Sequence, residues 1–459
     1  MEEAVALAPA PRVVSRAVRR RRALAAAVLL VAAANAGVIV WLWVHGGNLH
    51  PTSTGDALTS VGRITGLLAA YLALLQVLLL ARLPALERAI GFDRLSVWHR
   101  WNGHACVDLV VLHVVFTVWG YSLMDRFTIG HEISTMLGGG VYPGMITATI
   151  GTAFFVGVGA TSYVIVRRRL RYEWWYAVHL LVYAGIALSW FHEIPTGNEL
   201  VLDAAAADYW RGLYLATLAI LVVFRLAAPL VQLSRHGLRV AEVVEEGPGV
   251  VSVRIAGRRL DAFHAEPGQF FLWRFLDRRR IWTAHPFSLS AAPDGRSLRI
   301  TVKALGDYTA RMAGLRPGTR VLSEGPFGVF TEAAQRRREK VLLIAGGIGI
   351  TPVRALVERM RGDVVVLYRA LSDGDLVLRD ELDALAARAG LAVHYVVGDH
   401  RGDGERLLSP EHLRELVPDA AERDVFLCGP PAMIDVIRRN LRAAGIPRRQ
   451  VHLERFVLT

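Results

Sequence analysis

Four histidines in the apolar N-terminal half are the residues whose type and spacing point most directly to chemistry. They form two pairs along the chain, 14 and 13 positions apart: His99 with His113, and His179 with His192. An ionisable side chain at membrane depth is costly, so it indicates a functional site. At about 100° and 1.5 Å per residue, His99 and His113 lie near one helix face, about 21 Å apart along the axis.

The two histidine-bearing segments run in the same direction through the predicted membrane, which matches their histidines by depth. His99 and His179 fall near the cytoplasmic edge, and His113 and His192 fall toward the outer side. Two imidazoles that face each other at one depth are what a six-coordinate haem iron needs. The chain has no Cys-x-x-Cys-His motif, so the haem predicted at each level is non-covalent, of b type. Two such haems would carry electrons across most of the hydrocarbon core, which is about 30 Å thick.

Helix geometry supports the second pair less well than the first. Thirteen residues amount to about 220° on an ideal helix, which turns His192 away from the face of His179. Local unwinding at the helix exit would be needed to bring it back. An isolated membrane histidine is also more often a hydrogen-bonding residue between helices than a ligand. His104, four residues before Asp108, indicates such a structural polar pair.

The elements that must position these histidines are membrane helices. Of 459 residues, 53% are hydrophobic and 20% are charged, so the chain is neither an ordinary soluble protein nor embedded throughout. Its length predicts roughly three domains. Its two cysteines, Cys106 and Cys428, provide neither a disulfide framework nor a Cys-rich metal site. Six segments have about the 20 residues that a bilayer requires: Ala23–Val44, Ile64–Leu80, Val97–Leu123, Met145–Val166, Trp174–Trp190 and Gly212–Leu233.

The placement of arginines predicts the orientation of these spans. The net charge is +12, and the arginines beside apolar segments indicate membrane topology and lipid contact rather than nucleic-acid binding. They are concentrated in the N-terminal tail and in two connections: Arg12, Arg16, Arg19, Arg20, Arg21 and Arg22; Arg82, Arg88, Arg94 and Arg100; Arg167, Arg168, Arg169 and Arg171. The loops His45–Ala57 and Glu193–Asp208 contain no Lys or Arg. We therefore expect a multi-pass protein of the cell membrane with both termini in the cytoplasm.

Two arginines are predicted to open spans on the outer side, Arg63 the second and Arg211 the sixth. Haem propionates are anionic and lie at the membrane edge, where a guanidinium offers two parallel hydrogen bonds. Arg63 is therefore a candidate haem-binding residue. Snorkelling of the side chains to the interface explains both arginines equally well.

After residue 235, short strands separated by tight turns predict a small β-barrel. The strand-like segments are Leu238–Glu245, Val250–Ile255, Gln269–Phe275, Arg299–Lys303 and Arg320–Ser323. Two motifs stand within this region, His285-Pro286-Phe287-Ser288 and the run from Lys303 through Gly306 and Thr309. The second is typical of a strand that ends in a glycine turn and opens a helix. Such a turn directs backbone N–H groups and the Thr309 hydroxyl at an anion such as a pyrophosphate.

From residue 340 the pattern changes to the strand–helix alternation of a doubly wound α/β domain. The buried strand Val341–Ala345 is followed by Gly346-Gly347-Ile348-Gly349-Ile350-Thr351-Pro352 and a predicted helix, Val353–Arg361. Glycines allow a diphosphate to approach closely, Thr351 can cap the helix, and Pro352 fits its first turn. Cys428-Gly429-Pro430-Pro431 follows the strand Asp424–Leu427, at the carboxyl end where such folds bind ligands. The remaining elements expected here are strands Val364–Tyr368 and Ala392–Val397 and helices Asp380–Ala389 and Ala432–Ala444.

The ordered set of motifs gives the chain a family resemblance over nearly its whole length. The cytoplasmic half resembles the ferredoxin-NADP reductase superfamily through residues 285–288, Gly306 with Thr309, the loop 346–352 and Cys-Gly-Pro-Pro at 428–431. The membrane half resembles the ferric reductase and NADPH oxidase family, in which two spans carry histidine pairs at spacings of 14 and 13. The resemblance implies that all four histidines, His192 included, are haem ligands.

The resemblance also implies roles for the cytoplasmic motifs. Residues expected to bind FAD are His285, Pro286, Phe287, Ser288, Lys303, Gly306 and Thr309. Those expected to bind the nicotinamide nucleotide are Gly346, Gly347, Gly349, Thr351, Pro352, Cys428, Gly429 and Pro430. Ser288 would lie near the reactive nitrogen of the flavin, Cys428 would approach the nicotinamide ring, and Phe456 would lie over the flavin. Phe456 is followed by three more residues rather than being terminal.

In such folds the end of the second strand lies at the ribose 2′ position of the nucleotide, so the residues there predict whether NADPH or NADH binds. Tyr368-Arg369 places a cation there, and no acidic residue follows directly. This pattern favours NADPH. Asp373 and Asp375 lie close behind, which leaves NADH open.

These expectations combine into a transmembrane oxidoreductase. Its predicted parts are a basic tail (1–22), a six-helix di-haem domain (23–234), an FAD-binding β-barrel (238–334) and an NAD(P)H-binding α/β domain (340–459). Electrons would pass from cytoplasmic NADPH through FAD and two haems to an outer acceptor, with ferric chelate favoured and dioxygen as the alternative. A histidine-gated proton or ion pathway with a regulatory cytoplasmic domain is the alternative from another class.

Overall fold

The computed structural model describes residues 16–138, 142–163, 169–170, 172–335, 340–399 and 407–455. The chain divides into two compact units. The helical unit comprises Ala25–Leu86 and Arg94–Leu226. The second unit, called the cytoplasmic unit after its predicted location, comprises Met1–Leu24, Glu87–Asp93 and Ala227–Thr459. Each unit is described by itself.

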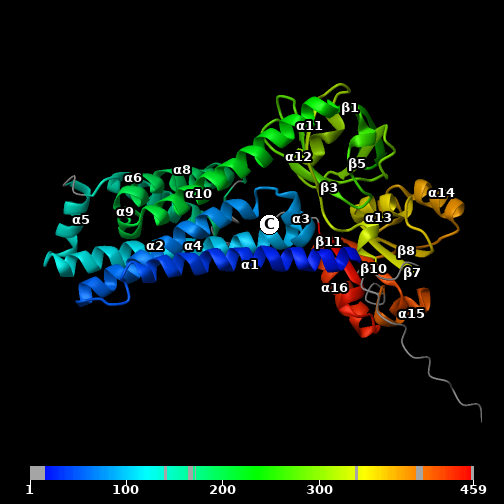
Figure 1. Cartoon of the computed structure of the whole chain (residues 1–459). Coiled ribbons are helices and arrows are strands. Elements are labelled where there is room, and N and C mark those ends of the chain that lie inside the picture. The colour runs from blue at the N-terminus through cyan, green and yellow to red at the C-terminus, as the bar shows by residue number, and fades with distance from the viewer. Residues whose placement is uncertain are drawn as a thin grey trace, which may run out of the picture. The chain divides into compact units, whose positions relative to one another are not determined.

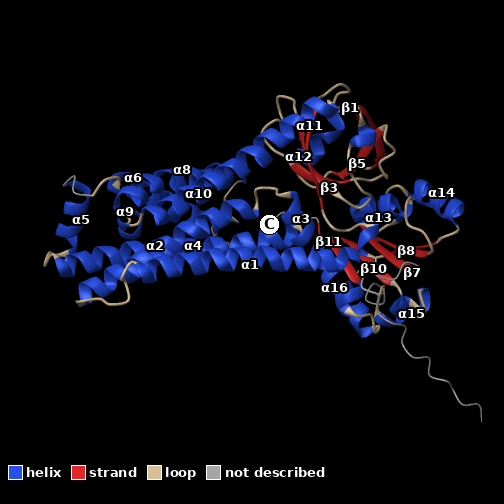
Figure 2. Cartoon of the chain, viewed as in Figure 1, coloured by secondary structure: helices blue, strands red, loops and turns tan. Residues whose placement is uncertain are grey.

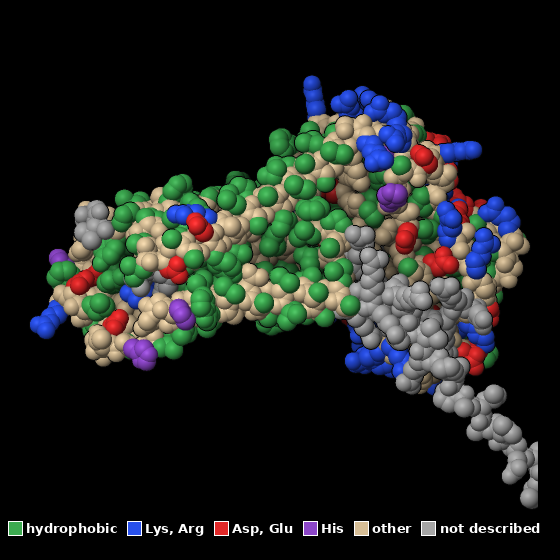
Figure 3. All heavy atoms as spheres, viewed as in Figure 1, with side chains coloured by type: hydrophobic (Ala, Val, Ile, Leu, Met, Phe, Trp, Pro, Cys, Tyr) green, Lys and Arg blue, Asp and Glu red, His purple; other side chains and the backbone are tan. Residues whose placement is uncertain are grey.

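Six helices of the described chain are long and apolar enough to cross a membrane, as predicted. They are α1 (Arg16–His45), α2 (Thr54–Leu79), α4 (Phe92–Met124), α6 (Met145–Ser162), α8 (Tyr172–Thr196) and α10 (Ala204–Leu221), which continues through a π-helical segment (Val222–Ala227) into α11 (Ala228–His236) (Figures 1 and 2). Hydrophobic side chains cover the visible surface of these helices (Figure 3). The protein is therefore a multi-pass membrane protein.

Two of these helices begin earlier than hydropathy predicted. Helix α2 begins at Thr54 rather than Ile64, because the Ser53 side chain accepts a hydrogen bond from the Asp56 N–H and caps it. Helix α10 begins at Ala204 rather than Gly212, because Asp203 caps it in the same way. The polar first turn of α2, Thr54-Gly55-Asp56, escapes a hydropathy window. Arg63 and Arg211 therefore lie inside their helices instead of opening them.

The other helical differences lie at the ends of spans. Helix α8 continues past the predicted end at Trp190 to Thr196 and includes Pro195. Three short helices between the spans were not predicted: α3 (Pro84–Ile90), α5 (Ile129–Gly138) and α9 (Asn198–Leu202).

The first cytoplasmic domain contains two three-stranded antiparallel sheets, ordered β1-β2-β5 and β4-β3-β6. Its elements are β1 (Arg239–Gly247), β2 (Val250–Ala256), β3 (Phe270–Phe275), β4 (His285–Ser288), β5 (Ser297–Lys303), β6 (Val321–Phe327) and the short helix α12 (Asp307–Ala310). Single bridges, Arg239 with Arg320 and Leu289 with Ile300, join the sheets. Within the described residues, these two bridges alone connect the two sheets of the predicted barrel. Strand β4 was not predicted from the sequence.

The second cytoplasmic domain is the predicted doubly wound α/β fold. Five parallel strands lie in the order β11-β10-β7-β8-β9. They are β7 (Lys340–Gly346), β8 (Asp363–Ala370), β9 (Ala392–Val397), β10 (Asp424–Gly429) and β11 (Val451–Arg455), with helices α13 (Ile350–Val357), α14 (Arg379–Ala389), α15 (Pro410–Leu416) and α16 (Pro431–Ala443). The strand order reverses between β7 and β10. A ligand crevice is therefore expected at their carboxyl ends.

Candidate functional site

The two histidines of α4 are oriented by carbonyl groups of α2. His99 Nδ1 lies 3.0 Å from the Gln76 carbonyl oxygen, and His113 Nδ1 lies 2.7 Å from that of Gly62. An imidazole that donates from Nδ1 to a carbonyl keeps its lone pair on Nε2, which is the tautomer that binds a metal.

In the two histidines of α8, Nδ1 also lies within hydrogen-bond distance of a partner, which is a hydroxyl group in each case. His179 Nδ1 lies 3.4 Å from Ser162 Oγ, and His192 Nδ1 lies 2.9 Å from Thr196 Oγ1. The Thr196 hydroxyl donates to the carbonyl of His192, so the ring N–H donates to Thr196 in turn. In His192 the Nε2 lone pair therefore remains for a metal. These four partner groups were not identified from the sequence.

The inner pair has the spacing of two axial ligands. The ring centroids of His99 and His179 lie 6.0 Å apart, with an angle of 50° between the ring planes. Two metal–imidazole bonds of about 2 Å each account for most of that distance. The distance from each coordinating nitrogen to the centroid of its ring accounts for the rest. Within the described residues no three His, Cys, Asp or Glu side chains gather to hold a metal ion. A pair of imidazoles therefore fits a metal that brings its own equatorial ligands, as haem iron does.

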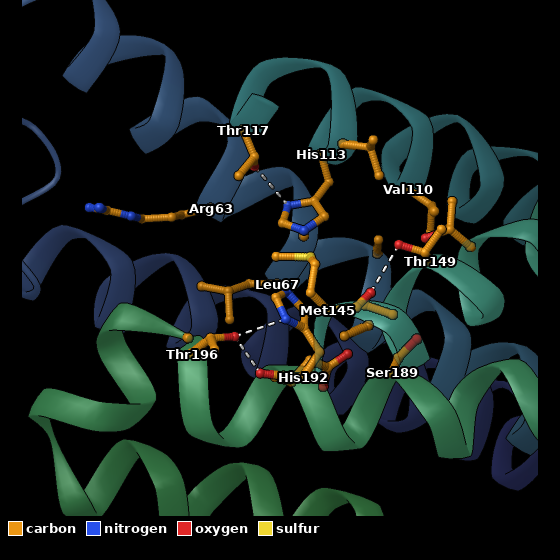
Figure 4. A pocket seen from close by; sticks show the side chains of 18 of the residues that line it. Arg63, Leu67, Val110, His113, Thr117, Met145, Thr149, Ser189, His192 and Thr196 are labelled. Carbon is orange, nitrogen blue, oxygen red and sulfur yellow. Dashed lines mark hydrogen bonds between the residues drawn. The ribbon is translucent and has the colours of Figure 1, made fainter. Parts of the chain in front are cut away.

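The outer pair lines a cavity of about 410 Å³ inside the helical unit. Figure 4 shows His113 entering from α4 and His192 from α8, with Arg63 on the α2 side. The backbone makes room for the His113 ring at Gly66, where a Cβ atom would lie 2.6 Å from His113 Nδ1. A glycine is thus required at this position of α2. The residues present fit a second haem.

The structure brings His192 into the cavity although the ideal-helix argument placed it off the face of His179. Helix α8 continues through His192 to Thr196 instead of ending at Trp190, and Pro195 lies in its last turn. Proline removes the hydrogen bond to the Phe191 carbonyl and distorts the turn. The same turn packs closely on Gly144, where a Cβ atom would lie 2.3 Å from the Phe191 oxygen.

Two further polar groups line the outer cavity. Arg63 donates from Nη1 to Asn48 Oδ1 at 3.0 Å. Glu193, which was not selected from the sequence, accepts a hydrogen bond of 2.6 Å from the Tyr214 hydroxyl.

Two other polar residues considered from the sequence make contacts elsewhere. Arg211 pairs with the exposed Asp208 at 2.8 Å. His104 packs edge-on against Tyr163, with ring centroids 5.1 Å apart.

The predicted flavin motif forms strand β4. The His285 ring stacks on Tyr308 with centroids 3.7 Å apart, and the Phe287 ring is nearly parallel to it, with centroids 6.3 Å apart. Burial lowers the pKa of His285 to about 4, so the ring is neutral at pH 7. The Ser288 hydroxyl is buried and has no hydrogen-bond partner among the residues that the structure describes. A buried, unpaired hydroxyl is costly, so it fits a polar atom of a bound flavin.

The residues predicted to hold the FAD pyrophosphate make other contacts in this structure. The Thr309 hydroxyl accepts hydrogen bonds from the N–H groups of Leu305 and Gly306, at 2.9 and 3.0 Å. These groups close the turn before α12 on itself instead of facing outward. Lys303 Nζ pairs with Asp375 Oδ1 of the α/β domain at 3.0 Å. The FAD-binding roles of Lys303 and Thr309 stay predictions, and these contacts are the ones that FAD binding would have to accommodate.

The predicted dinucleotide turn lies at the crevice between β7 and β10. At Gly346 a Cβ atom would meet Met433 Sδ at 2.1 Å, and at Gly349 it would meet the Cys428 carbonyl oxygen at 2.5 Å. Gly347 has a left-handed φ of +52°. These glycines let the turn pack against Gly429 and the end of β10. The Thr351 hydroxyl is buried and donates to the Ile348 carbonyl at 3.1 Å, while Pro352 lies in the first turn of α13.

Cys428, the second-to-last residue of β10, lies beside an acidic residue that was not predicted from the sequence. It pairs in register with Glu454 of β11, and both residues are buried. Burial, and then the Glu454 charge, raise the pKa of the Cys428 thiol, so it stays protonated. The alternation of β11 gave no signal for this burial, because it places Glu454 on the same face as His452 rather than with Val451 and Leu453. Pro430 caps α16, and Phe456 lies outside the described residues.

The structure contradicts the predicted role of Arg369. Its side chain is buried, at 4% exposed, rather than presented to a 2′-phosphate. The guanidinium donates to three backbone carbonyls, those of Ala370, Val396 and Gly398. A buried cation must satisfy its N–H groups, and the ends of β8 and β9 supply the acceptors. The argument for NADPH over NADH therefore loses its basis.

Three family models match successive parts of the chain. A ferric reductase like transmembrane component matches residues 65–190, an FAD-binding domain matches 237–331, and an oxidoreductase NAD-binding domain matches 343–439. The order is that of a membrane domain fused to a two-domain flavin reductase.

Characterised proteins are similar to the cytoplasmic half. The glycine betaine monooxygenase reductase subunit of Pseudomonas aeruginosa (strain UCBPP-PA14) is 27% identical over 237 residues, which are 48% of this chain and 64% of that protein. Ferredoxin–NADP reductase B of Sorangium cellulosum (strain So ce56) is 31% identical over 189 residues, 37% of this chain and 77% of that protein. The flavohemoprotein of Pseudomonas putida (strain KT2440) is 32% identical and is matched over 51% of its length. The chain thus spans only about half to two thirds of the relatives it first matches.

Among solved structures, the flavohem-like FAD/NAD-binding domain of nitric oxide dioxygenase from Vibrio cholerae O1 biovar El Tor is similar, with 23% identity and a TM-score of 0.41. The match covers 48% of this chain and 97% of that one. A TM-score this low carries no argument about function.

Proposed function

Because the chain belongs to the ferric reductase and NADPH oxidase family, we propose that it passes electrons from cytoplasmic NAD(P)H through FAD and two b-type haems to an acceptor on the outer side. The nicotinamide donor and the flavin follow from the two cytoplasmic domains. The haems, their ligands and the direction of transfer are the proposed part.

The observation that carries the proposal is the shared orientation of the four membrane histidines. In each ring Nδ1 is hydrogen-bonded, by a carbonyl for His99 and His113 and by a hydroxyl for His179 and His192. A metal-bound imidazole typically has its other ring nitrogen hydrogen-bonded to a group of this kind.

The residues of this chain would orient the cofactors and exclude water from them. When bound, flavin and haem supply the two-electron and one-electron chemistry that side chains lack. His285 and Tyr308 would hold the flavin face, and the Ser288 hydroxyl would hydrogen-bond its polar edge. Gly66 would leave room for the outer haem, and Arg63 would face its propionates.

We favour an anionic ferric chelate as the acceptor. Arg63 places a cation at the outer haem cavity, and a cation attracts such a chelate over distances at which neutral dioxygen feels no force. Dioxygen reduction to superoxide is the competing outcome.

A reduced-minus-oxidised visible spectrum of the purified protein tests the proposal. Wild type should contain two low-spin b haems per chain, and His113→Ala should retain one while flavin reduction by NAD(P)H continues. The matched control is His131→Ala, because His131 is exposed on α5 outside the cavity. One haem or none in wild type would refute the proposal. Product assays with ferric citrate, and with dioxygen plus superoxide dismutase, identify the acceptor.

A further inference from the structure

An ion-pair network joins the two cytoplasmic domains away from the residues proposed to touch the cofactors. Its charged members, here called the interdomain latch, are Arg299 on β5 with Arg354, Glu358 and Glu381 of the α/β domain. Arg299 binds Glu381 through both Nη atoms, at 2.6 and 2.8 Å. Arg354 Nε lies 2.9 Å from the same carboxylate. One carboxylate therefore holds guanidinium groups from both domains.

The latch also binds the segment that follows β4, the strand of the predicted flavin motif. The Ser290 carbonyl, two residues after Ser288, accepts hydrogen bonds from Arg299 at 3.0 Å and from Arg354 at 3.3 Å. Glu358 accepts the Ala292 N–H at 2.5 Å and pairs with Arg354 at 2.7 Å. These hydrogen bonds and the ion pair hold the segment after β4 against α13.

The two guanidinium groups of the latch are sheltered, its carboxylates are partly exposed (Glu381 at 35%), and the charges balance. The Arg299 and Arg354 side chains are 13% and 10% exposed, and two carboxylates face two guanidinium groups. Burial disfavours the charge on Glu381, but the hydrogen bond and charge of Arg299 and the charge of Arg354 outweigh it and lower the Glu381 pKa. Bidentate arginine–carboxylate pairs of this kind fix geometry as well as attraction.

We propose that the interdomain latch positions the nicotinamide against the flavin. It fixes the separation between β4, which carries the flavin motif, and α13, whose first turn follows the dinucleotide loop. The proposal rests on the NAD(P)H-to-flavin step of the proposed function. In that step a hydride leaves C4 of the nicotinamide with both electrons and bonds to the flavin, so the nucleotide is oxidised and the flavin is reduced. A misplacement of about 1 Å can cost about a hundredfold in such a rate.

Glu381→Gln in the full-length protein, reconstituted in nanodiscs, tests the latch. We expect the rate constant of flavin reduction in stopped-flow experiments to fall at least tenfold, while the Kd for NAD(P)⁺ changes less than twofold. Lys340→Met is the matched control, because Lys340 forms ion pairs of 2.9 and 2.8 Å with Asp419 and Glu422 inside the α/β domain alone. Its rate constant should stay within twofold of wild type.

Hydrogen–deuterium exchange gives a readout that does not depend on turnover. In protein without FAD, residues 289–293 and 351–358 should exchange faster in Glu381→Gln than in Lys340→Met. Arg299→Gln combined with Glu381→Gln should slow flavin reduction no more than either change alone, because the groups act as a unit. Arg299→Lys retains the charge without the bidentate geometry, and it provides an intermediate rate if Glu381→Gln fails to fold.

The proposal is overturned if Glu381→Gln matches Lys340→Met in both flavin reduction and exchange. A wild-type flavin that NAD(P)H does not reduce would instead refute the proposed function. Exchange in the FAD-free protein would then still decide whether the latch holds β4 to α13.

Discussion

At the scale of single residues, one hydrogen bond limits what each membrane histidine can do. A ring that donates from Nδ1 to the Gly62 or Gln76 carbonyl presents only an acceptor at Nε2. A proton relay would require both nitrogens to exchange protons with polar neighbours. An arrangement that ties Nδ1 to α2 therefore suits a ligand better than a relay.

Arg369 shows the opposite case, a cation whose buried position removes it from ligand binding. We expect Arg369→Ala to lower the free energy of unfolding by about 2–3 kcal/mol, because hydrogen bonds from a charged group contribute about 1.5–3 kcal/mol and three carbonyls lose their donor. The KM values for NADPH and NADH should change by the same factor. Thermal unfolding and steady-state reduction of an artificial acceptor measure both effects. A loss confined to NADPH would return Arg369 to the 2′-phosphate site.

At the scale of elements, α2 acts as the template on which α4 presents its histidines. It provides the carbonyls that orient both α4 rings and the glycine that accommodates one of them. Neither role depends on an α2 side chain. The helix was predicted from its apolar length alone, which says nothing about which turn faces α4.

Gly66→Ala tests this role of α2. The new Cβ would lie 2.6 Å from His113 Nδ1, so the ring must move and the outer haem should be lost. Haem content by pyridine haemochromogen assay should fall from two per chain to about one, with the inner haem spectrum retained. Gly157→Ala on α6 is the matched control, because nothing lies within 4 Å of its Cβ position. Two haems in Gly66→Ala would show that the cavity tolerates the shift.

At the scale of the whole molecule, the chain combines a lipid-facing helical unit with a charged cytoplasmic unit. Exposed apolar side chains such as Leu30 and Val31 of α1 are unfavourable in water and favourable in lipid. Electron transfer across the membrane requires the two units to lie on defined sides. The arginine-rich segments predict those sides.

Cysteine labelling tests the orientation. The native Cys106 and Cys428 are buried, so an introduced cysteine reports its own position. In intact cells a membrane-impermeant maleimide should label Leu49→Cys in the loop between α1 and α2 and leave Glu332→Cys unlabelled. Inverted vesicles should show the reverse pattern. Labelling of Glu332→Cys in intact cells would invert the topology and rule out a cytoplasmic electron donor.

The sequence by itself determined the number of membrane helices, the α/β fold and the positions of the glycine turns. These features depend on local properties: apolar length, period and the absence of a Cβ atom. The barrel was predicted less completely, because β4 is only four residues long and contains Pro286. Helix starts at Thr54 and Ala204 were missed because side-chain caps outweigh hydropathy there.

Only the tertiary structure decided which groups meet. Arg369 and Lys303 carry charge wherever they lie, but the neighbouring carbonyls and Asp375 determine what that charge binds. The partners of the four histidines come from other helices or from the next turn, so spacing within one helix could not reveal them. Glu454 meets Cys428 only because β10 and β11 pair in the sheet. Local pattern fixes an element, whereas contacts between distant segments depend on packing, which a single sequence does not display.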